Sequence, residues 1–335
     1  MKNAAVKLKT FAFFILVFPF SFLIFNFADA QAQILPPPLS LTSLPSSPSP
    51  GENFTLTAST PTFDKNAAFF EWVVTGKARP ELSGFGNNVI TLTAGKVGET
   101  VGILVRASRS GGETSQASLT VWTSDLALSW HAESIVPKWY KGKILASPNA
   151  TVAVVAIPRI ILASQTLRPA ELIYRWSIDN ERNAEAGVGK QTFRFRASQF
   201  TGTTHQIDVV IEDIERKISK HGRMLVTTIS PRVAIYPSSP LGGVELRTAN
   251  FLATAKRGLL DFVAEPFFFP VAGRGGLTWR WNIDGISSGG TQSAPHLATV
   301  DTHQRQSGQV QISATVDDTN ILTPSVTKTQ TLFLQ

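Results

Sequence analysis

Short segments in which hydrophobic and polar residues alternate recur along the chain from about residue 40 to its end. Five of them are NFTLTAS (53–59), TVAVVAI (151–157), IDVVIED (207–213), RMLVTTI (223–229) and VQISATV (310–316). Side chains of a β-strand alternate between its two faces, and β-branched residues favour strands. Clusters of Gly, Pro, Ser, Asn and Asp, which are turn-forming residues, separate the segments. The pattern predicts an all-β protein of short antiparallel strands with very little helix.

A tryptophan that follows another aromatic residue by two positions occurs three times at nearly constant spacing. The segments are AFFEWVVTG (68–76), LIYRWSIDN (172–180) and LTWRWNIDG (277–285), and their tryptophans lie 104 and 105 residues apart. Residues two apart on a strand face the same side, and the Thr-Gly, Asp-Asn or Asp-Gly that follows supplies a turn into the next strand. We therefore predict that the paired rings form a structural core: Phe70, Trp72, Tyr174, Trp176, Trp279 and Trp281.

Hydrophobic residues also recur at fixed distances after each tryptophan. Offsets of 31, 33 and 35 give Ile103, Val105 and Ala107 in the first copy, Ile207, Val209 and Ile211 in the second, and Ile312, Ala314 and Val316 in the third. Each set predicts the core face of one further strand. Units of about 100 residues with many short strands indicate β-sandwiches. We predict three tandem Ig-like antiparallel β-sandwich domains, at residues 38–122, 123–230 and 231–335.

Three stretches resemble PKD-type and other Ig-like extracellular repeats. They are the strand end at Trp281–Gly285, the stretch SPSPGENFTLTA at Ser47–Ala58, and the strand V-x-I-x-A-x-V-D-D at Val310–Asp318. The likeness covers residues 35 to 335 and implies the sandwich fold. It implies roles found among adhesins, pilus components, surface-layer proteins and spacers of secreted enzymes. The arrangement also resembles, without a diagnostic motif, uncharacterised secreted bacterial proteins associated with type IV pili.

The first thirty residues have the layout of a secretory signal peptide. Three lysines precede a seventeen-residue apolar run, 11–27, and the small-residue sequence Ala28-Asp29-Ala30 follows it. We predict a signal peptide at 1–30, cleaved after Ala30 or Ala32, and a Pro-rich linker at 31–37. The alternative is an uncleaved anchor helix, because seventeen residues lie at the lower limit for spanning a bilayer. Either way the chain is predicted to be exported, to the periplasm, the cell surface or the extracellular space.

Composition excludes several kinds of chemistry. The chain has no cysteine, so it has no disulfide, no thiolate metal site and no cysteine nucleophile. The formal charge of +7 falls to +5 without residues 1–30, and the remaining basic residues are scattered. Nucleic-acid binders concentrate Lys and Arg on one face or in a run, so no nucleic-acid partner is expected.

The second and third units carry insertions, at 133–149 and 244–260, that the first lacks. Loops added to a fixed scaffold commonly hold binding sites. The candidate partner-binding residues combine rings with positive charge, suited to stacking on sugar or to an acidic partner. The alternative is that the rings pack against the sandwich edge or a neighbouring domain while the lysines stay solvated. These residues are Lys138, Trp139, Tyr140, Lys141 and Lys143.

The run Phe267–Phe269 raises the same choice, because three consecutive residues of a strand cannot all face inward. At least one of these rings is expected at an interdomain contact or on an exposed patch.

No catalytic set can be assembled from the motifs. The G-x-S-x-G match at 285–289 lacks the helix that a nucleophile elbow needs, and the five histidines show no metal-ligand spacing. Asp179 and Asp284 sit at equivalent turns, which are either ordinary turn carboxylates or oxygen-rich positions for calcium. We predict no catalytic, cofactor-binding or metal residues.

The sequence thus predicts an exported, non-enzymatic structural or interaction protein of the cell envelope or surface, in an adhesion, pilus-associated or scaffold role. Its expected partners are envelope or surface proteins or glycans, with membrane contact only through the N-terminal segment if that segment is uncleaved. The alternatives are a carbohydrate or cell-wall binding module and, from another class, a secreted hydrolase.

Overall fold

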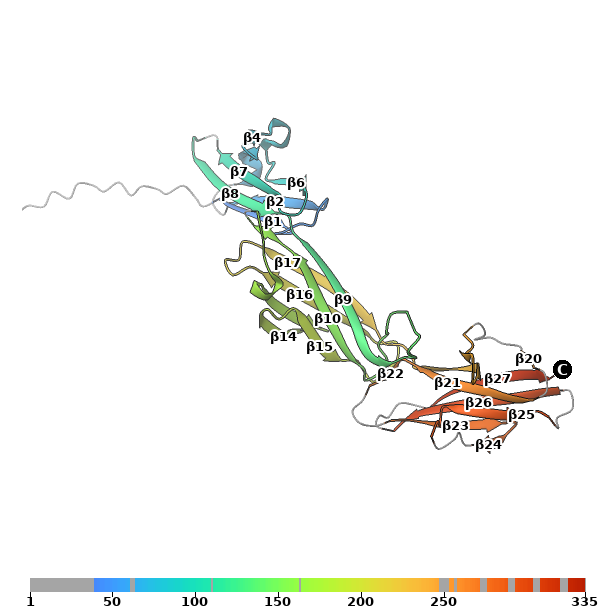
Figure 1. Ribbon diagram of the computed structural model, residues 1–335. Coiled ribbons are helices and arrows are strands. Elements are labelled where there is room, and N and C mark those ends of the chain that lie inside the picture. Colours follow the sequence, from blue (N-terminus) through green and yellow to red (C-terminus); the bar gives the residue numbers. More distant parts are fainter. Residues whose placement is uncertain are drawn as a thin grey trace, which may run out of the picture. The chain divides into compact units, whose positions relative to one another are not determined.

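The computed structural model consists almost entirely of β-strands, with three short 3-10 helices, over the part of the chain that it describes (Figure 1). This confirms the predicted all-β fold of tandem sandwiches. The predicted signal peptide and linker lie outside the described residues, which are 39–60, 64–109, 111–162, 164–246, 253–255, 258–271, 276–288, 293–303, 308–319 and 325–334.

The first sandwich, β1 to β8, contains two antiparallel sheets. One sheet has the order β1-β2-β6, and the other has the order β4-β3-β7-β8 with β5 also paired to β3. The 3-10 helices η1 (Lys65–Ala67) and η2 (Pro80–Leu82) lie in its connections. The strands are β1 (Ser40–Leu44), β2 (Asn53–Ser59), β3 (Phe69–Val74), β4 (Lys77–Ala78), β5 (Gly84–Phe85), β6 (Val89–Thr93), β7 (Thr100–Ser108) and β8 (Thr114–Trp122).

The second sandwich, β9 to β17, repeats this plan with longer strands. Its sheets have the orders β15-β10-β9-β22 and β14-β13-β16-β17, and β11 and β12 form a small hairpin before the 3-10 helix η3 (Pro169–Glu171). The strands are β9 (Asp125–Ile135), β10 (Thr151–Arg159), β11 (Ile161–Leu162), β12 (Gln165–Thr166), β13 (Ile173–Ile178), β14 (Glu181–Val188), β15 (Thr192–Arg196), β16 (Thr204–Glu212) and β17 (Ser219–Thr227).

The third sandwich, β18 to β27, has sheets of the orders β19-β18-β21-β25 and β20-β27-β26-β23-β24. The pairing of β20 with β27 is parallel, whereas its other pairings are antiparallel. The strands are β18 (Arg232–Ser239), β19 (Gly243–Val244), β20 (Ala253–Ala255), β21 (Leu259–Phe267), β22 (Phe269–Pro270), β23 (Leu277–Ile283), β24 (Ile286–Ser288), β25 (Leu297–Asp301), β26 (Gly308–Asp318) and β27 (Val326–Leu334).

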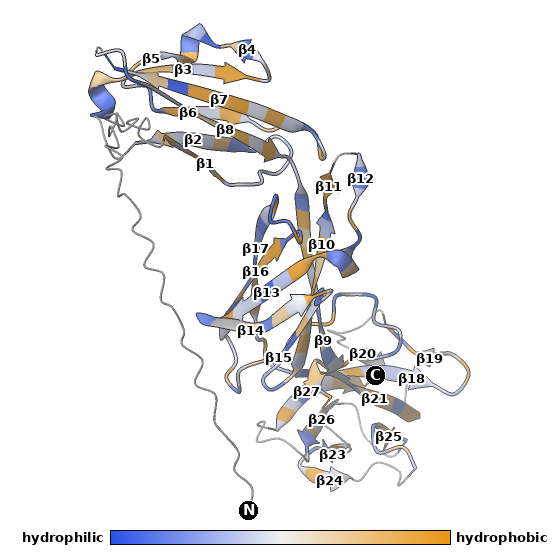
Figure 2. Ribbon diagram, turned by 90° about the vertical axis from the view of Figure 1, so that its left-hand side faces the viewer, coloured by the Kyte–Doolittle hydropathy of each residue, from blue (hydrophilic) through white to orange (hydrophobic). Residues whose placement is uncertain are grey.

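Each sandwich encloses its own hydrophobic core, built around one tryptophan. Trp72, Trp176 and Trp281 are 0%, 0% and 1% exposed, and each lies in the core cluster of its own sandwich. Figure 2 shows hydrophobic and hydrophilic residues interleaved along the strands, as expected where one face of each sheet is buried. The residues at offsets of 31, 33 and 35 are also buried.

The three indoles make the same polar contact. Each Nε1 donates a hydrogen bond to a backbone carbonyl 14 or 15 residues further along: that of Asn87, Lys190 or Pro295, at 2.8, 2.7 and 3.1 Å. A buried indole N–H needs such a partner. The recurring bond ties the central strand of one sheet to the chain that enters the facing sheet.

The turns after the tryptophan strands are two-residue turns in all three sandwiches. Their central pairs, Thr75-Gly76, Asp179-Asn180 and Asp284-Gly285, all have positive φ, between 47° and 82°. Positive φ at both central residues matches the right-handed twist of the hairpin strands and favours Gly, Asn and Asp. The Thr-Gly, Asp-Asn and Asp-Gly dipeptides therefore form the turns that the sequence predicts.

Two features differ from the sequence expectation. Residues 133–135 of the proposed insertion 133–149 continue strand β9, so the added loop begins after Ile135. Much of the second insertion, 244–260, lies outside the described residues. Trp279 packs against the third core but is only partly buried, with its ring centroid 6.1 Å from that of His296.

Candidate interaction surfaces

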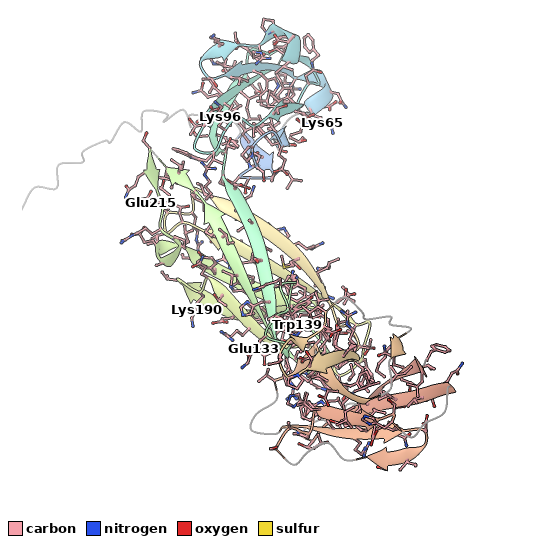
Figure 3. The ribbon with its side chains drawn as sticks, turned by 45° about the vertical axis from the view of Figure 1, so that its right-hand side comes forward. Lys65, Lys96, Glu133, Trp139, Lys190 and Glu215 are labelled. Carbon is pink, nitrogen blue, oxygen red and sulfur yellow. The ribbon has the colours of Figure 1, made fainter. Side chains whose placement is uncertain are left out.

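The two aromatic residues of the candidate loop lie in the junction between the second and third sandwiches. The ring centroid of Trp139 is 5.5 Å from that of Tyr236 and 5.8 Å from that of Phe267, both edge to face (Figure 3). Tyr140 contacts Phe267 and Phe268 in the same way, at 5.8 and 5.7 Å. Such pairs contribute about 0.5–1.5 kcal/mol each beyond the area they bury. The rings are therefore part of the junction, not of an open surface.

A short strand of the third sandwich completes this junction. In β22, Phe269 and Pro270 pair antiparallel with Ile135 and Ser134 at the end of β9. Just before it, the backbone N–H of Phe268 donates to the carbonyl of Ile135 at 2.7 Å. Phe268 has a φ of 62°, which turns the chain from β21 into β22. The second sandwich thus gains a strand from the third.

All three phenylalanines of the run 267–269 are buried, at 4%, 2% and 1% exposure. Phe269 belongs to the core of the third sandwich, and Phe267 and Phe268 belong to the junction cluster. The sequence left open an interdomain contact or an exposed patch, and the structure has the interdomain contact. The kink at Phe268 is what allows consecutive rings to be buried in different clusters.

The lysines of the loop behave differently from its rings. Lys138 and Lys141 are exposed, and the Nζ of Lys143 lies 3.8 Å from the centroid of the Trp130 ring. Partial burial lowers the pKa of Lys143. None of the three forms an ion pair within the described part of the chain. Of the five predicted residues, Trp139 and Tyr140 are therefore partly buried in the junction, whereas the three lysines are exposed.

The junction between the first and second sandwiches contains a buried polar contact. Lys220 of β17, with 8% of its side chain exposed, donates from Nζ to the carbonyl of Ser47 at 2.9 Å and to the Oγ of Ser49 at 2.7 Å. Burial lowers the pKa of Lys220, although the negative charges of Glu52 and Asp125 act in the opposite direction. One buried ammonium, a serine carbonyl and a serine hydroxyl therefore form the polar part of this junction, and the Trp122 ring of β8 packs against the second core beside them.

A polar depression lies on the outer face of β13, β16 and β17. These strands are neighbours in one sheet (Figure 2). Asp208 lines it and accepts three hydrogen bonds, from Gln206 Nε2 at 2.8 Å, His221 Nε2 at 2.9 Å and Arg223 Nε at 2.7 Å. Partial burial raises the pKa of Asp208, but the hydrogen bonds from Arg223, Gln206 and His221 outweigh it and leave the pKa below its ordinary value. Asp208 is thus an ionised anchor for its neighbours.

Motif reading of the sequence missed this cluster, because its members come from three strands. One signal was present. Asp208 and Arg223 carry opposite charges on the two strands of a predicted hairpin, and they are direct register partners. Opposite charges at facing positions of paired strands attract each other.

One arrangement resembles part of a hydrolase triad but cannot act as one. His205 Nδ1 lies 2.6 Å from Asp179 Oδ2, and His205 Nε2 accepts a hydrogen bond from the backbone N–H of Ser198 at 2.9 Å. A general base needs a free nitrogen facing the nucleophile's hydroxyl. Here a backbone N–H occupies that nitrogen, so the Asp-His pair has a structural role.

The predicted G-x-S-x-G match has no helix after it in the described residues, since Ser287 lies inside strand β24. Asp179 and Asp284 each accept a hydrogen bond from a backbone N–H of the neighbouring strand, from Gln206 of β16 at 2.8 Å and from Gln311 of β26 at 2.7 Å. Within the described ranges, three or more His, Asp or Glu side chains nowhere come together as a metal site would require.

None of the helices among the described residues has the length and apolar character needed to cross a membrane.

Comparison with known proteins gives likeness of fold only. No protein-family model and no curated protein matches the chain. The central fibronectin-III array of RIM-binding protein is 11% identical, with 90% of this chain and 97% of that chain covered and a TM-score of 0.33. The three N-terminal domains of the bacteriophage RB49 highly immunogenic outer capsid protein are 12% identical, with 89% and 98% covered and a TM-score of 0.25.

A 1.5-MDa bacterial ice-binding adhesin, solved in connection with host cell surface retention, is 12% identical, with 90% of this chain and 100% of that chain covered and a TM-score of 0.23. At these identities the likeness concerns tandem Ig-like and fibronectin-III-like sandwiches and carries no statement about activity.

Proposed function

We propose that the chain is an exported, non-enzymatic structural and interaction protein of the cell envelope or surface, in which consecutive sandwiches space and present contact surfaces. The observation that carries the proposal is the built junction between the second and third sandwiches, where β22 extends the sheet of β9 and the Trp139 ring packs among Tyr236 and Phe267. Modules joined through a packed junction suit a spacer or scaffold better than modules on a free linker do.

The polar side chains support the same proposal. The closest approach to a catalytic set, Asp179 with His205, is used to hold two backbone segments. The apolar run and the Ala28-Asp29-Ala30 sequence favour export. Envelope or surface proteins and glycans are the proposed partners, with Lys138, Lys141 and Lys143 as one contact surface.

The experiment is a pull-down from the native cell envelope with residues 31–335. We expect recovery of identified pilus or wall components. The matched variant changes Lys138, Lys141 and Lys143 to glutamine, which removes three charges and leaves the junction rings in place. Loss of the recovered component with this variant would assign the contact to the lysines. Hydrolysis of an ester, peptide or glycoside substrate by the purified chain would overturn the proposal.

A carbohydrate or cell-wall binding role is the second candidate, and the depression around Asp208 favours it. Stacking of a sugar on Trp139 is not part of this candidate, because that ring faces Tyr236 and Phe267 in the junction.

A further inference from the structure

Equivalent positions of the three sandwiches can be compared on the outer face of the sheet that contains the tryptophan strand. Asp208 lies 32 residues after its tryptophan, and the same offset gives Leu104 in the first sandwich and Ser313 in the third. The register partner of Asp208 is Arg223, whereas Leu104 faces Ser118 and Ser313 faces Thr329. The fold therefore does not require the Asp208 cluster, which belongs to the second sandwich alone.

Hydrogen-bond donors exceed acceptors in this depression. The Asp208 carboxylate already accepts three hydrogen bonds, while Arg223 uses only its Nε. Arg175 uses its Nη2 on Glu212 Oε1, at 2.5 Å. The other guanidinium N–H groups find no acceptor among the described residues, and the side chains of Arg223 and Arg175 are 57% and 36% exposed. A ligand that complements this surface must supply acceptor oxygens.

Two held guanidinium groups favour an oxyanion. Guanidinium presents parallel N–H donors that match the two oxygens of a carboxylate or the oxygens of a sulfate. Asp208 fixes Arg223 through Nε and Glu212 fixes Arg175 through Nη2, so less side-chain entropy is lost on binding. The hydroxyl of Ser177, the amide of Asn180 and the imidazole of His221 line the same depression and suit ring hydroxyls.

We propose that this depression binds the acidic groups of an anionic polysaccharide, with Arg223 and Arg175 contacting a carboxylate or sulfate and Ser177, Asn180 and His221 contacting the neighbouring hydroxyls. The inference rests on the proposed interaction function and names the class of one partner. No Phe, Tyr or Trp ring of the described residues lines the depression. Stacking on such large rings, the usual means of holding nucleic-acid bases or the faces of neutral sugars, therefore does not contribute to it.

The test uses residues 31–335 and three polymers at low ionic strength, because salt screens exposed charges. The polymers are polygalacturonate, which carries carboxylates, dextran sulfate, which carries sulfates, and unmodified dextran as the neutral control. Titration calorimetry or affinity electrophoresis measures binding to each. The wild-type chain is expected to bind one or both acidic polymers and not dextran, and the stronger of the two identifies the oxyanion.

The main variant is Arg223→Gln, which keeps the side-chain length and removes the charged fork. We expect it to weaken polyanion binding about ten-fold or more, as loss of a charge-assisted hydrogen-bond pair predicts. Arg223→Lys keeps the charge but lacks the guanidinium fork, and its affinity for the polymer should lie between those of the wild-type chain and Arg223→Gln. The matched control is Arg194→Gln on the opposite sheet of the same sandwich, which removes an equally exposed arginine, 59%, that pairs with Glu133. This control should change binding less than two-fold.

Equal losses from Arg223→Gln and Arg194→Gln would show a general charge effect and overturn the proposal. Loss only on changing Lys138, Lys141 and Lys143 to glutamine would place the polymer on the loop and also overturn it. Loss of polymer binding by Arg223→Gln with unchanged recovery of envelope components supports this site and leaves the proposed function intact. Intact polymer binding with no recovered component would contradict the proposed function alone.

Discussion

The two junctions of the molecule join similar sandwiches through different buried contacts. Between the first and second sandwiches, the ammonium of Lys220 donates to the backbone carbonyl of Ser47 and to the hydroxyl of Ser49. Between the second and third sandwiches, aromatic rings around Phe267 make it, and a backbone ladder with Ile135 supports it. The same fold can therefore be joined to its copies in two ways, and the insertion after β9 is what changes the second junction.

The two kinds of contact also differ in energy. Burying aromatic area stabilises by about 25 cal/mol per Å², without a requirement for partners. Burying an ammonium costs free energy that its hydrogen bonds must offset, so the net gain from a polar contact is small. Removing a ring from the aromatic junction should therefore cost more than removing the lysine from the polar one.

The largest effect is expected from Phe267→Ala. This ring is 4% exposed and contacts Trp139, Tyr140 and Phe268, with the Arg232 guanidinium 5.2 Å from its centroid. Truncation leaves a cavity in the junction and should lower the free energy of unfolding of the third sandwich by about 3–5 kcal/mol. Scanning calorimetry of residues 31–335 measures it as a lower transition temperature.

The matched control for this change is Phe85→Ala in the first sandwich. Phe85 is 71% exposed and has one edge-to-face partner, Phe69, at 5.3 Å. Its truncation should cost about 1 kcal/mol or less. Equal effects of the two variants would show that the rings at the junction do not stabilise the molecule more than surface rings do.

A smaller effect is expected from Lys220→Ala at the polar junction. The change leaves the carbonyl of Ser47 without its donor, and Ser47 is 1% exposed. It should cost about 1–3 kcal/mol in the free energy of unfolding, measured by urea titration. Lys217→Ala, which removes a 56% exposed lysine paired with Glu215, should change it much less, because an exposed ion pair is screened by solvent. A larger loss of stability from Lys217→Ala than from Lys220→Ala would contradict the stabilising role assigned to Lys220.

The smallest expected effect is a change with pH in the stability difference between the wild-type chain and Lys220→Ala. Burial lowers the pKa of Lys220 from 10.5 in the folded state. The unfolded chain therefore binds more protons between the lowered pKa and 10.5, and the stability of the wild-type chain rises with pH through that window. Lys220→Ala lacks this rise, so the stability difference between the two chains should grow as pH increases toward 10.5.

Tyrosine ionisation acts with the opposite sign and is shared by both chains. Burial raises the pKa of Tyr174 to about 12, which removes stability as the pH rises above 10. Comparing the two chains at each pH cancels this contribution. A stability difference that shrinks between pH 8 and pH 10 would show that the Lys220 ammonium is not disfavoured by burial.

The fold could be predicted from the sequence because it depends on local and periodic signals. The aromatic-x-Trp spacing predicts strands β3, β13 and β23, and Thr75-Gly76, Asp179-Asn180 and Asp284-Gly285 predict the turns after them. Alternation alone decides which rings face inward. The same reasoning overestimated the burial of Trp279, because a side chain at the correct offset is not always covered completely by the facing sheet.

The contacts between sandwiches could not be read in the same way. Lys220 and Ser47 are 173 residues apart in the chain, and no periodicity connects them. For the loop 138–143 the sequence left two readings open, because composition does not say what a ring packs against. The structure directs Trp139 and Tyr140 into the junction, and partner binding by the lysines stays a prediction.

The strand β22 has a consequence for how the molecule forms. A chain that is synthesised from its N-terminus delivers Phe269 and Pro270 more than forty residues after the last strand of the second sandwich, β17. Until then the end of β9 lacks its outer neighbour and the Trp139 ring lacks Phe267. The sheet that contains β9 therefore gains its last strand only after β22 of the third sandwich has been synthesised.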